Sequence, residues 1–414
     1  MAEEVKKSRP APDPNSAKFK LGQIAAKAYS DAMEAKKRGE MVGWCASNFP
    51  VEIPETLGLY VCYPENQAAG IAARGGGERM CNEAEGEGYS NDICAYARIS
   101  LAYAKLKSAP EQDMPMPDFV LCCNNICNCM TKWYENIARM CNVPLIMIDI
   151  PYNNTVEVAD QNVRYVRGQF DKAIKQLEEL TGKKFDEKKF EHACENANRT
   201  AKAWLKVCDY LQYKPAPYSG FDLFNHMADV VTARARVEAA EAFEQLAKDL
   251  DETIAKGETT TPFPEKYRVM FEGIPCWPKL PALFKPLKAN GVNVTAVVYA
   301  PAFGFVYNGL DEMARAYYKA PNSVCIEQGV AWREGICRDN KVDGVLVHYN
   351  RSCKPWSGYM AEMQRRFTAD LGIPCAGFDG DQADPRNFNA AQYETRVEGL
   401  VEAMEANKQA KEAK

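Results

Sequence analysis

The sequence predicts an α/β protein with two flavodoxin-like or Rossmann-like lobes on parallel sheets, joined by a helical region. Three observations predict this class: short apolar runs alternate with helical segments, a long polar middle lacks such runs, and both ends share one order of landmarks. Alternating strands and helices are typical of parallel βαβ units. We expect the functional site in the cleft between the lobes, because such folds bind ligands beyond the carboxyl ends of their strands.

The first lobe is expected over residues 41–155, after an N-terminal tail and helix over residues 1–40. The segment from Lys18 to Arg38 is rich in alanine and lysine and predicts a helix. Residues 41–66 predict a strand, a turn, a helix and a strand, and further strands are expected at 117–125 and 143–151. Between those two strands, apolar residues at i, i+3, i+4 and i+7 predict an amphipathic helix: Met130, Trp133, Tyr134 and Ile137.

A helical region and linker are expected over residues 156–262. Glycine and proline cluster at 213–224, and the sequence TTTPFPEKY at 259–267 predicts a junction. The second lobe is expected over 263–405 and a C-terminal tail over 406–414. Its predicted strands lie at 269–276, 292–300, 342–349 and 373–381, with a helix at 357–372.

The two lobes are predicted to be structural repeats. In each, an aspartate opens a strand, a cysteine follows the strand in a polar turn, a helix comes next, and a second strand runs from a proline to an aspartate. The residues are Asp118, Cys127, Pro144 and Asp149 in the first lobe, and Asp343, Cys353, Pro374 and Asp379 in the second. This correspondence predicts that Cys127 and Cys353 approach the same cleft.

Composition narrows the possible function. The chain has sixteen cysteines but three histidines, His192, His226 and His348, which are far apart, so a histidine-based metal site is not expected. The N-terminus has neither a signal-peptide core nor a membrane span, which predicts a cytoplasmic protein with reduced thiols. The net charge of -5 argues against nucleic acid as a partner.

Three cysteines are candidate ligands of an iron–sulfur cluster: Cys94, Cys127 and Cys353. Each lies in a polar turn where a deprotonated sulfur can accept hydrogen bonds, although their spacing is not a compact ferredoxin run. The residues alone leave open the alternative of small buried hydrophobes. That alternative is favoured for Cys141, Cys208, Cys276, Cys325 and Cys375, and also for Cys122, Cys123 and Cys129, which flank the turn but are expected to point elsewhere.

Longer segments carry a family resemblance. The sequences YPENQAAGIAA, NDICAYARISLAYA, MPDFVLCCNNICNCMTKWYENIAR, HYNRSCKPWSGYM and AGFDGDQADPRNFNAAQYETR resemble the first subunit of the 2-hydroxyacyl-CoA dehydratases, nearest to the members that act on 2-hydroxyglutaryl-CoA. The resemblance extends from Val42 to about Glu405. Some of those members carry a long insertion between the ISLAYA and MPMPDF segments, which this sequence lacks. Benzoyl-CoA reductases are a related type whose motifs match less closely.

The resemblance implies an oxygen-sensitive heterodimer of anaerobic amino-acid fermentation. Each subunit would hold a [4Fe-4S] cluster, here on Cys94, Cys127 and Cys353 with one iron lacking a cysteine ligand. A separate ATP-hydrolysing iron–sulfur activator would supply one electron, and no GxxxxGK[ST] loop occurs in this chain. Whether the complex also binds FMN or riboflavin stays open. The implied reaction converts (R)-2-hydroxyglutaryl-CoA to (E)-glutaconyl-CoA and water through a ketyl radical anion.

The resemblance also implies two substrate-contacting residues, Ser47 as a hydrogen-bond donor and Glu65 as the acid–base. From the sequence alone, Glu65 could equally stabilise the dipole of a helix first turn, and Glu52 and Glu55 are nearby alternatives that we expect to be solvated. Two other functions stay open. One is dehydration of another acyl chain (phenyllactyl-CoA, 2-hydroxyisocaproyl-CoA or lactoyl-CoA), and the other is an electron-transfer or scaffold subunit.

Overall fold

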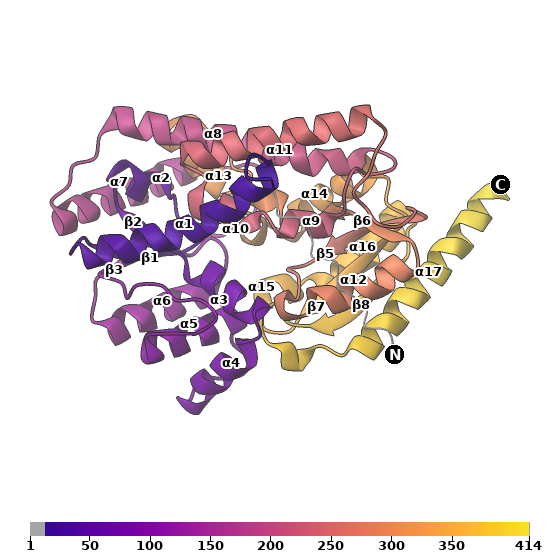
Figure 1. Ribbon diagram of the computed structural model, residues 1–414, viewed down its shortest axis with the longest axis horizontal. Coiled ribbons are helices and arrows are strands. Elements are labelled where there is room, and N and C mark those ends of the chain that lie inside the picture. The colour runs from indigo at the N-terminus through magenta and orange to yellow at the C-terminus, as the bar shows by residue number, and fades with distance from the viewer. Residues whose placement is uncertain (1–12, 414) are drawn as a thin grey trace.

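Residues 13–413, which the computed structural model describes, contain two parallel sheets of four strands each (Figure 1). The first sheet has the order β2-β1-β3-β4 and consists of β1 (Val42–Cys45), β2 (Tyr60–Cys62), β3 (Phe119–Cys123) and β4 (Leu145–Ile148). The second has the order β6-β5-β7-β8 and consists of β5 (Tyr267–Glu272), β6 (Val292–Val297), β7 (Gly344–Asn350) and β8 (Cys375–Gly380). The predicted α/β class with two parallel lobes is confirmed.

The same hydrogen bonds fix the register of both sheets. Asp118 donates its backbone N–H to the Val42 carbonyl over 2.7 Å, and its carboxylate accepts the Val42 N–H over 2.8 Å. In the second lobe, Asp343 makes the same two bonds to Arg268, at 2.7 and 2.8 Å. Each aspartate therefore aligns the third strand of its lobe with the first.

The prolines that open the fourth strands also correspond. The Pro144 carbonyl accepts from Val120 over 2.9 Å, and the Pro374 carbonyl accepts from Val345 over 3.0 Å. Because a one-residue slip would turn every side chain to the opposite face, these bonds determine which residues follow each strand into the cleft. The repeat predicted from the order of landmarks is thus present in the backbone pairing.

Close packing explains one glycine in the first sheet. A Cβ atom at Gly43 would lie 2.3 Å from the ring of Phe119 on the neighbouring strand. Both residues are on strands that are buried along their whole length. Glycine at this position therefore lets an aromatic side chain fill the space between two paired strands.

Helices of the first lobe pack around its sheet and on one another (Figure 1). They are α1 (Ala17–Lys37), α2 (Glu52–Thr56), α3 (Pro64–Ala73), α4 (Gly77–Gly86), α5 (Ala95–Leu106) and α6 (Asn128–Cys141). The helix predicted from Lys18 to Arg38 is α1, and the amphipathic helix predicted around Trp133 is α6, whose four predicted apolar residues are all buried.

The middle of the chain is helical, as predicted. It contains α7 (Asp160–Thr181), α8 (Glu187–Asp209), α9 (Gly220–Phe224), α10 (Met227–Ala233) and α11 (Val237–Ala255). Figure 1 shows α8 and α11 running along the top of both sheets, so that they join the lobes. Their contact includes the rings of Trp204 and Phe243, whose centroids are 5.4 Å apart, and an ion pair between Arg199 and Glu244 at 2.9 Å.

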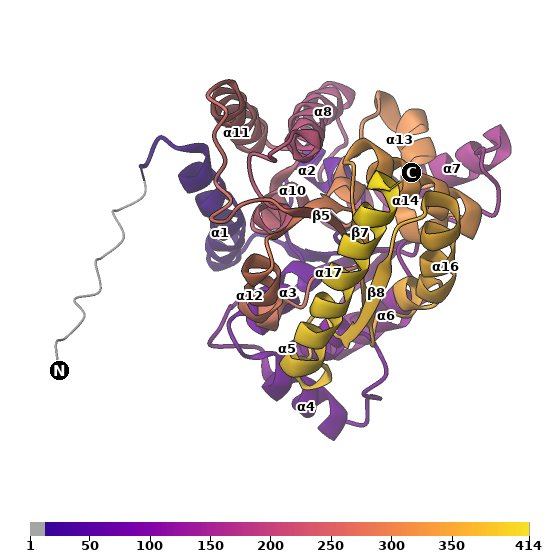
Figure 2. The same cartoon turned by 90° about the vertical axis from the view of Figure 1, so that its right-hand side faces the viewer.

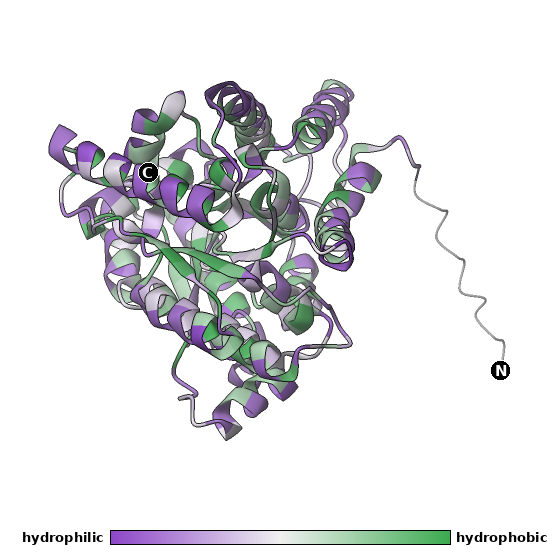
Figure 3. Cartoon of the chain, turned by 90° about the vertical axis from the view of Figure 1, so that its left-hand side faces the viewer, coloured by the Kyte–Doolittle hydropathy of each residue, from purple (hydrophilic) through white to green (hydrophobic). Residues whose placement is uncertain are grey.

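The second sheet is covered by α12 (Leu280–Ala289), α14 (Ile326–Asp339), α15 (Lys354–Ser357), α16 (Met360–Leu371) and α17 (Ala390–Glu412), whereas α13 (Gly309–Tyr317) packs against α7. Helix α17 lies in front of β8 in Figure 2 and extends past residue 405, where the sequence placed the end of the second lobe. Figure 3 shows hydrophobic residues concentrated in the central strands and hydrophilic residues on the outer faces of the helices. Within residues 13–413, no helix combines the length and the apolar character needed to span a membrane.

A buried carboxyl group connects α10 to α1. Asp229 is 2% exposed and accepts the backbone N–H of Ala25 over 3.1 Å. Burial raises the pKa of Asp229 to about 8, because the apolar surroundings disfavour the charged form, and the Ala25 N–H offsets part of this rise. The folded protein therefore keeps this carboxyl group protonated at neutral pH.

This raised pKa predicts that Asp229→Asn stabilises the fold in a pH-dependent way. The unfolded carboxyl group ionises near pH 4, whereas the folded one ionises near pH 8, so this group destabilises the fold progressively as the pH rises between the two values. The asparagine variant should gain roughly 2–5 kcal/mol at pH 8 and much less at pH 4. Urea unfolding at both pH values measures this. The control is Asp311→Asn at an exposed site on α13, and equal gains in both variants would contradict the prediction.

Candidate active site

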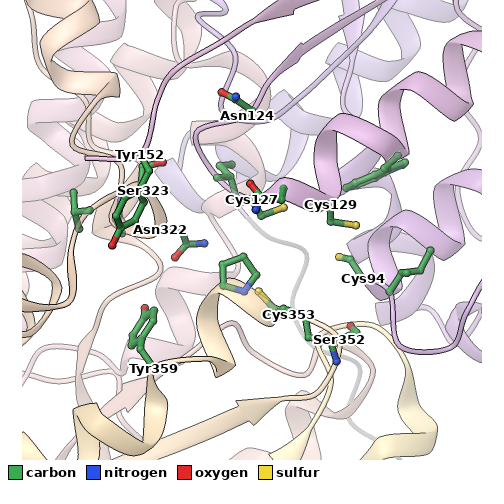
Figure 4. A pocket seen from close by; sticks show the side chains of 18 of the residues that line it. Cys94, Asn124, Cys127, Cys129, Tyr152, Asn322, Ser323, Ser352, Cys353 and Tyr359 are labelled. Carbon is green, nitrogen blue, oxygen red and sulfur yellow. The ribbon is translucent and has the colours of Figure 1, made fainter. Parts of the chain in front are cut away.

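A cavity of about 1180 Å³ opens between the lobes beyond the carboxyl ends of β3 and β7. Both lobes contribute to its wall, and five cysteines line it: Cys94, Cys127, Cys129, Cys325 and Cys353. Figure 4 shows four of these side chains, all except Cys325, around the same space. This is the position at which parallel α/β sheets bind ligands. The structure thus brings together the three thiols predicted from the sequence.

The three predicted thiols share one position relative to a helix. Cys94 is the N-cap residue of α5, Cys127 of α6 and Cys353 of α15. In each case a backbone N–H three residues along the chain lowers the thiol pKa. The N-terminus of a helix favours a negative charge through its free N–H groups and its dipole. Burial is the larger effect and raises the pKa of all three thiols, so the N–H groups offset only part of the cost of a buried thiolate.

Contacts from the second lobe hold Cys94 in place. The side-chain amide of Gln382 donates to the Cys94 sulfur over 3.2 Å, and the N–H of Ala95 donates to the Ser352 hydroxyl over 3.0 Å. One turn along α5, the fully buried Arg98 forms ion pairs with Asp384 at 2.8 Å and with Glu85 at 2.6 Å. Cys94 belongs to the first lobe in sequence but is positioned by the second.

The electrostatics of the cavity require a cation if several thiolates are to coexist. Burial raises the pKa of Cys94, and the nearby Cys129, Cys353 and Cys127 raise it further. Burial likewise raises the pKa of Cys353 to about 12. Thiolate ligands are normally stabilised by the positive charge of the metal that they bind. The donor set in this cavity therefore fits a group that carries iron.

The thiols of the cavity are not gathered around the position of one ion. Among residues 13–413, no three His, Cys, Asp or Glu side chains are close enough together to coordinate one metal ion. In an iron–sulfur cube each cysteine binds a different iron, so the sulfur atoms surround a larger volume than the ligands of one ion do. Thiols from separate helices around one cavity fit that arrangement.

Cys129 differs from its sequence-based interpretation. We expected it to point away from the turn, but it lies in the first turn of α6 and lines the cavity, where burial raises its pKa and the backbone N–H of Cys94 offsets part of the rise. Unlike the other three thiols, it lies inside a helix and does not cap one. A sequence signal existed, because Cys129 is two residues from Cys127, but the direction of a side chain in a first helical turn depends on how that helix docks.

The predicted catalytic pair lies together in a second cavity. Glu65 is in the first turn of α3, after β2, and Ser47 follows β1; both line a cavity of about 610 Å³. The backbone N–H of Ser47 donates to one Glu65 carboxylate oxygen over 3.0 Å, and the hydroxyl of Tyr134 donates to the other over 2.5 Å. The structure therefore brings Ser47 to Glu65, and it adds Tyr134, which sequence reasoning had assigned to packing on α6.

Two opposing effects act on the Glu65 carboxyl group. Burial raises its pKa, and the hydrogen bonds from Tyr134 and Ser47 lower it, with a net rise. A carboxyl group whose pKa is moved towards neutral exchanges protons more readily near physiological pH. This environment differs from that of a solvated carboxylate in a helix first turn, which was the alternative for Glu65.

The expectation that Glu52 and Glu55 are both solvated is wrong for Glu52. Glu52 is fully buried and pairs with Arg234 at 3.2 Å, while Glu55 is half-buried and pairs with Arg236 at 3.4 Å. The short helix α2 packs against α8, and its carboxylates meet two arginines in the segment between α10 and α11. Both groups are therefore engaged in ion pairs.

Comparison with known proteins identifies the family of the chain. The profile of a family described as 2-hydroxyglutaryl-CoA dehydratase, D-component, matches residues 46–404. The chain belongs to this family. The matched range contains the residues that line the larger cavity, and Ser47 and Glu65 of the smaller one. The family resemblance predicted from the sequence segments is confirmed. A member of this family is a subunit of a 2-hydroxyacyl-CoA dehydratase, which is a hydro-lyase.

Three relatives cover almost the whole dehydratase chain. The (R)-2-hydroxyglutaryl-CoA dehydratase subunit alpha of Acidaminococcus fermentans is 63% identical over 94% of this chain and 97% of its own length. The (R)-phenyllactyl-CoA dehydratase alpha subunit of Clostridium sporogenes is 53% identical over 95% and 97%. The (R)-2-hydroxyisocaproyl-CoA dehydratase alpha subunit of Clostridioides difficile is 46% identical over 95% and 97%. These relatives are named as alpha subunits, so their enzymes contain further subunits.

The alignment lengths agree with the missing insertion. The alignment with the Acidaminococcus fermentans protein spans 464 positions, whereas this chain has 414 residues, so that relative contains residues without a counterpart here. The alignment with the Clostridium sporogenes protein spans 394 positions. The chain is thus nearer to the first relative in identity but resembles the second in length.

Proposed function

We propose that this chain is the alpha-type subunit of an oxygen-sensitive (R)-2-hydroxyacyl-CoA dehydratase that converts (R)-2-hydroxyglutaryl-CoA to (E)-glutaconyl-CoA and water. The name of the relative at 63% identity supports this substrate. The observation that carries the proposal is the convergence of three helix-capping thiols from both lobes on one cavity, beside a second cavity with a buried glutamate. An acid–base dehydratase without a redox group has no need of such thiols.

Cys94, Cys127 and Cys353 would hold a [4Fe-4S] cluster, which leaves one iron without a cysteine ligand. Such a cluster, when bound, supplies one-electron chemistry and an open coordination position for a substrate oxygen. The protein contributes the helix N-termini that stabilise the thiolates and the Gln382 amide that donates to the Cys94 sulfur. Hydrogen bonds to cluster sulfurs tune the reduction potential, so Gln382 has a second role besides positioning.

Glu65 would move the protons of the reaction. Its carboxylate would take the C3 proton of the substrate and return a proton to the departing 2-hydroxyl group, so that water leaves. Ser47 and Tyr134 hold both oxygens of Glu65, which fixes the direction of its lone pairs. Ser47 would also donate a hydrogen bond to the substrate through its side chain.

The partners follow from the same proposal. A beta subunit with its own [4Fe-4S] cluster completes the enzyme, and a separate ATP-dependent iron–sulfur protein delivers the electron. FMN or riboflavin could accompany the complex. The role of a scaffold or relay subunit is a weaker candidate, because a relay has no use for Glu65, whose buried carboxylate faces a cavity. Dehydration of a CoA ester with another acyl chain is the stronger alternative. The relative named as a phenyllactyl-CoA dehydratase subunit, at 53% identity, makes phenyllactyl-CoA a substrate to test.

An anaerobic assay of the reconstituted complex tests the function. The panel consists of the CoA esters of 2-hydroxyglutarate, phenyllactate, 2-hydroxyisocaproate and lactate, with formation of the 2-enoyl-CoA as the measurement. We expect the 2-hydroxyglutaryl ester to have the highest kcat/KM, and we expect activity to require the beta subunit, the activator and ATP, and to be lost in air. Dehydration by the single chain without activator or reductant would refute the radical chemistry, and preference for another ester would reassign the substrate.

The cluster assignment predicts the effects of four cysteine variants. Replacement of Cys94, Cys127 or Cys353 by alanine should lower the iron and sulfide content and the cluster EPR signal of the anaerobically purified complex, because each variant removes one ligand. The matched control is Cys129→Ala, which removes a thiol from the same cavity but not from a helix N-cap. Its cluster content should equal that of the parent. Intact clusters in the other three variants, or loss in Cys129→Ala alone, would contradict the assignment.

The acid–base role predicts that Glu65→Gln lowers kcat by a factor on the order of 10²–10⁴ while cluster content and CoA-ester binding stay unchanged. Glutamine can still accept from the Ser47 N–H, so the fold should tolerate it. Because the Glu65 pKa is raised, the acidic limb of the parent pH–rate profile should lie above that of an ordinary carboxylate, and the variant should lack this limb. Glu55→Gln serves as the control. Turnover by Glu65→Gln within a few-fold of the parent would leave the role to another group.

A further inference from the structure

Tyr299 occupies a position in the second lobe that parallels that of Glu65 in the first. Glu65 follows β2, which lies beside β1 at the edge of its sheet, and Tyr299 follows β6, which lies beside β5 at the edge of the other. Both residues line the same cavity of about 610 Å³, together with Ser47. The repeated topology therefore brings a carboxyl group and a phenol to one cavity from opposite lobes.

The aromatic ring of Tyr299 is fixed at the seam between the lobes. It packs against both hydrophobic clusters of the protein: one contains Trp44 and extends to Cys94 and Cys127, and the other contains Trp356 and extends to Cys353. Its centroid lies 5.6 Å from that of Phe303 at an interplanar angle of 89°, and 6.1 Å from that of Trp356 at 78°. Edge-to-face contacts on two sides restrict the ring, and with it the position of the hydroxyl group.

A chain of donors leads to the Tyr299 hydroxyl. The indole N–H of Trp277 donates to the Tyr96 hydroxyl, and the Tyr96 hydroxyl in turn lowers the pKa of Tyr299, as a donor does. Trp277 and Tyr96 line the same cavity. A tyrosine hydroxyl has one proton and two acceptor positions. Because Trp277 already donates to the Tyr96 hydroxyl, the Tyr96 proton is directed to another acceptor, and Tyr96 and Tyr299 lie side by side in the cavity wall.

Tyr299 also lies between the two groups of proposed reacting residues. Burial raises its pKa, and the nearby Cys353 and Glu65 raise it further, followed by Cys94 after the opposing effect of Tyr96. The Tyr299 hydroxyl is therefore close enough to interact electrostatically with thiols of the larger cavity and with the carboxylate of the smaller one. The phenol stays protonated, so it is a hydrogen-bond donor and not a base.

We propose that Tyr299 is a third substrate-contacting residue, which donates a hydrogen bond to an oxygen of the 2-hydroxyacyl thioester between Glu65 and the thiol cavity. The inference rests on the proposed function. A thioester carbonyl and a 2-hydroxyl group are both acceptors, and a donor that is held rigidly before the substrate binds needs no reorganisation during the reaction. No proton or electron is transferred by Tyr299, so its contribution is to orient the substrate and stabilise negative charge on oxygen.

The test is Tyr299→Phe, which keeps the ring and its contacts and removes only the hydroxyl group. In the holoenzyme we expect kcat to fall by a factor on the order of 10². Cluster EPR and iron content should equal those of the parent. Binding is measured by calorimetry on the resting complex with glutaryl-CoA, which has the carbonyl but no 2-hydroxyl group, and with 2-hydroxyglutaryl-CoA. The dissociation constant of at least one ester should rise about three- to tenfold. A rise for both identifies the carbonyl as the acceptor, and a rise for the hydroxy ester alone identifies the hydroxyl group.

Tyr267→Phe is the matched control, because the Tyr267 hydroxyl bonds to Glu405 at the opposite end of the strands, away from both cavities. Its kinetics and binding should equal those of the parent. The inference would be overturned if the dissociation constants and kcat of Tyr299→Phe stayed within twofold of those of the parent. It would also be overturned if Tyr299→Phe lost the cluster, because the hydroxyl group would then support the cluster and not the substrate. Failure of the proposed function is a different result: in that case the parent complex itself would dehydrate none of the esters.

Discussion

The buried ion pair between Arg98 and Asp384 connects the two halves of the site. Arg98 is fully buried on α5, and its backbone N–H donates to the carbonyl of Cys94 over 3.0 Å. Asp384 follows β8 and is two residues from Gln382, which donates to the Cys94 sulfur. Removing one partner of a buried pair typically costs about 3–5 kcal/mol. The position of Cys94 relative to Cys353 therefore depends on the Arg98–Asp384 ion pair, because water cannot solvate either buried charge if its partner is removed.

The repeated lobe explains why the reacting groups meet. Each sheet has the same strand order, and Asp118 and Asp343 align equivalent strands with equivalent hydrogen bonds. Because all strands within a sheet are parallel, residues after their carboxyl ends gather at one edge. Two such edges face each other, so both lobes contribute residues to both cavities. The thiols that begin helices after these turns gain the stabilisation that helix N-termini give to a negative charge.

The two cavities differ in the chemistry that their walls support. The larger one is lined by thiols and fits a redox group, whereas the smaller one surrounds a glutamate with hydrogen-bond donors. Proton transfer requires a carboxyl group with a pKa near neutral, and electron transfer requires a metal group that is shielded from water. Their separation allows each environment to be tuned by its own neighbours. Tyr299 stands between them, with aromatic contacts that hold it from both lobes.

The sequence by itself determined the strands, the amphipathic helix around Trp133 and the repeat, because periodicity and landmark order are local properties of the chain. It singled out three thiols in polar turns, and the family segments predicted Ser47 and Glu65, whereas the place of the thiols at helix N-termini came from the structure. Only the tertiary structure decided that Cys129 faces the cavity, that Glu52 is buried against Arg234, and that Tyr134 bonds to Glu65. In each case the partner lies on a different element, and in the case of Glu52 it is 182 residues away. Such contacts depend on how helices dock on the sheets, which no local pattern encodes.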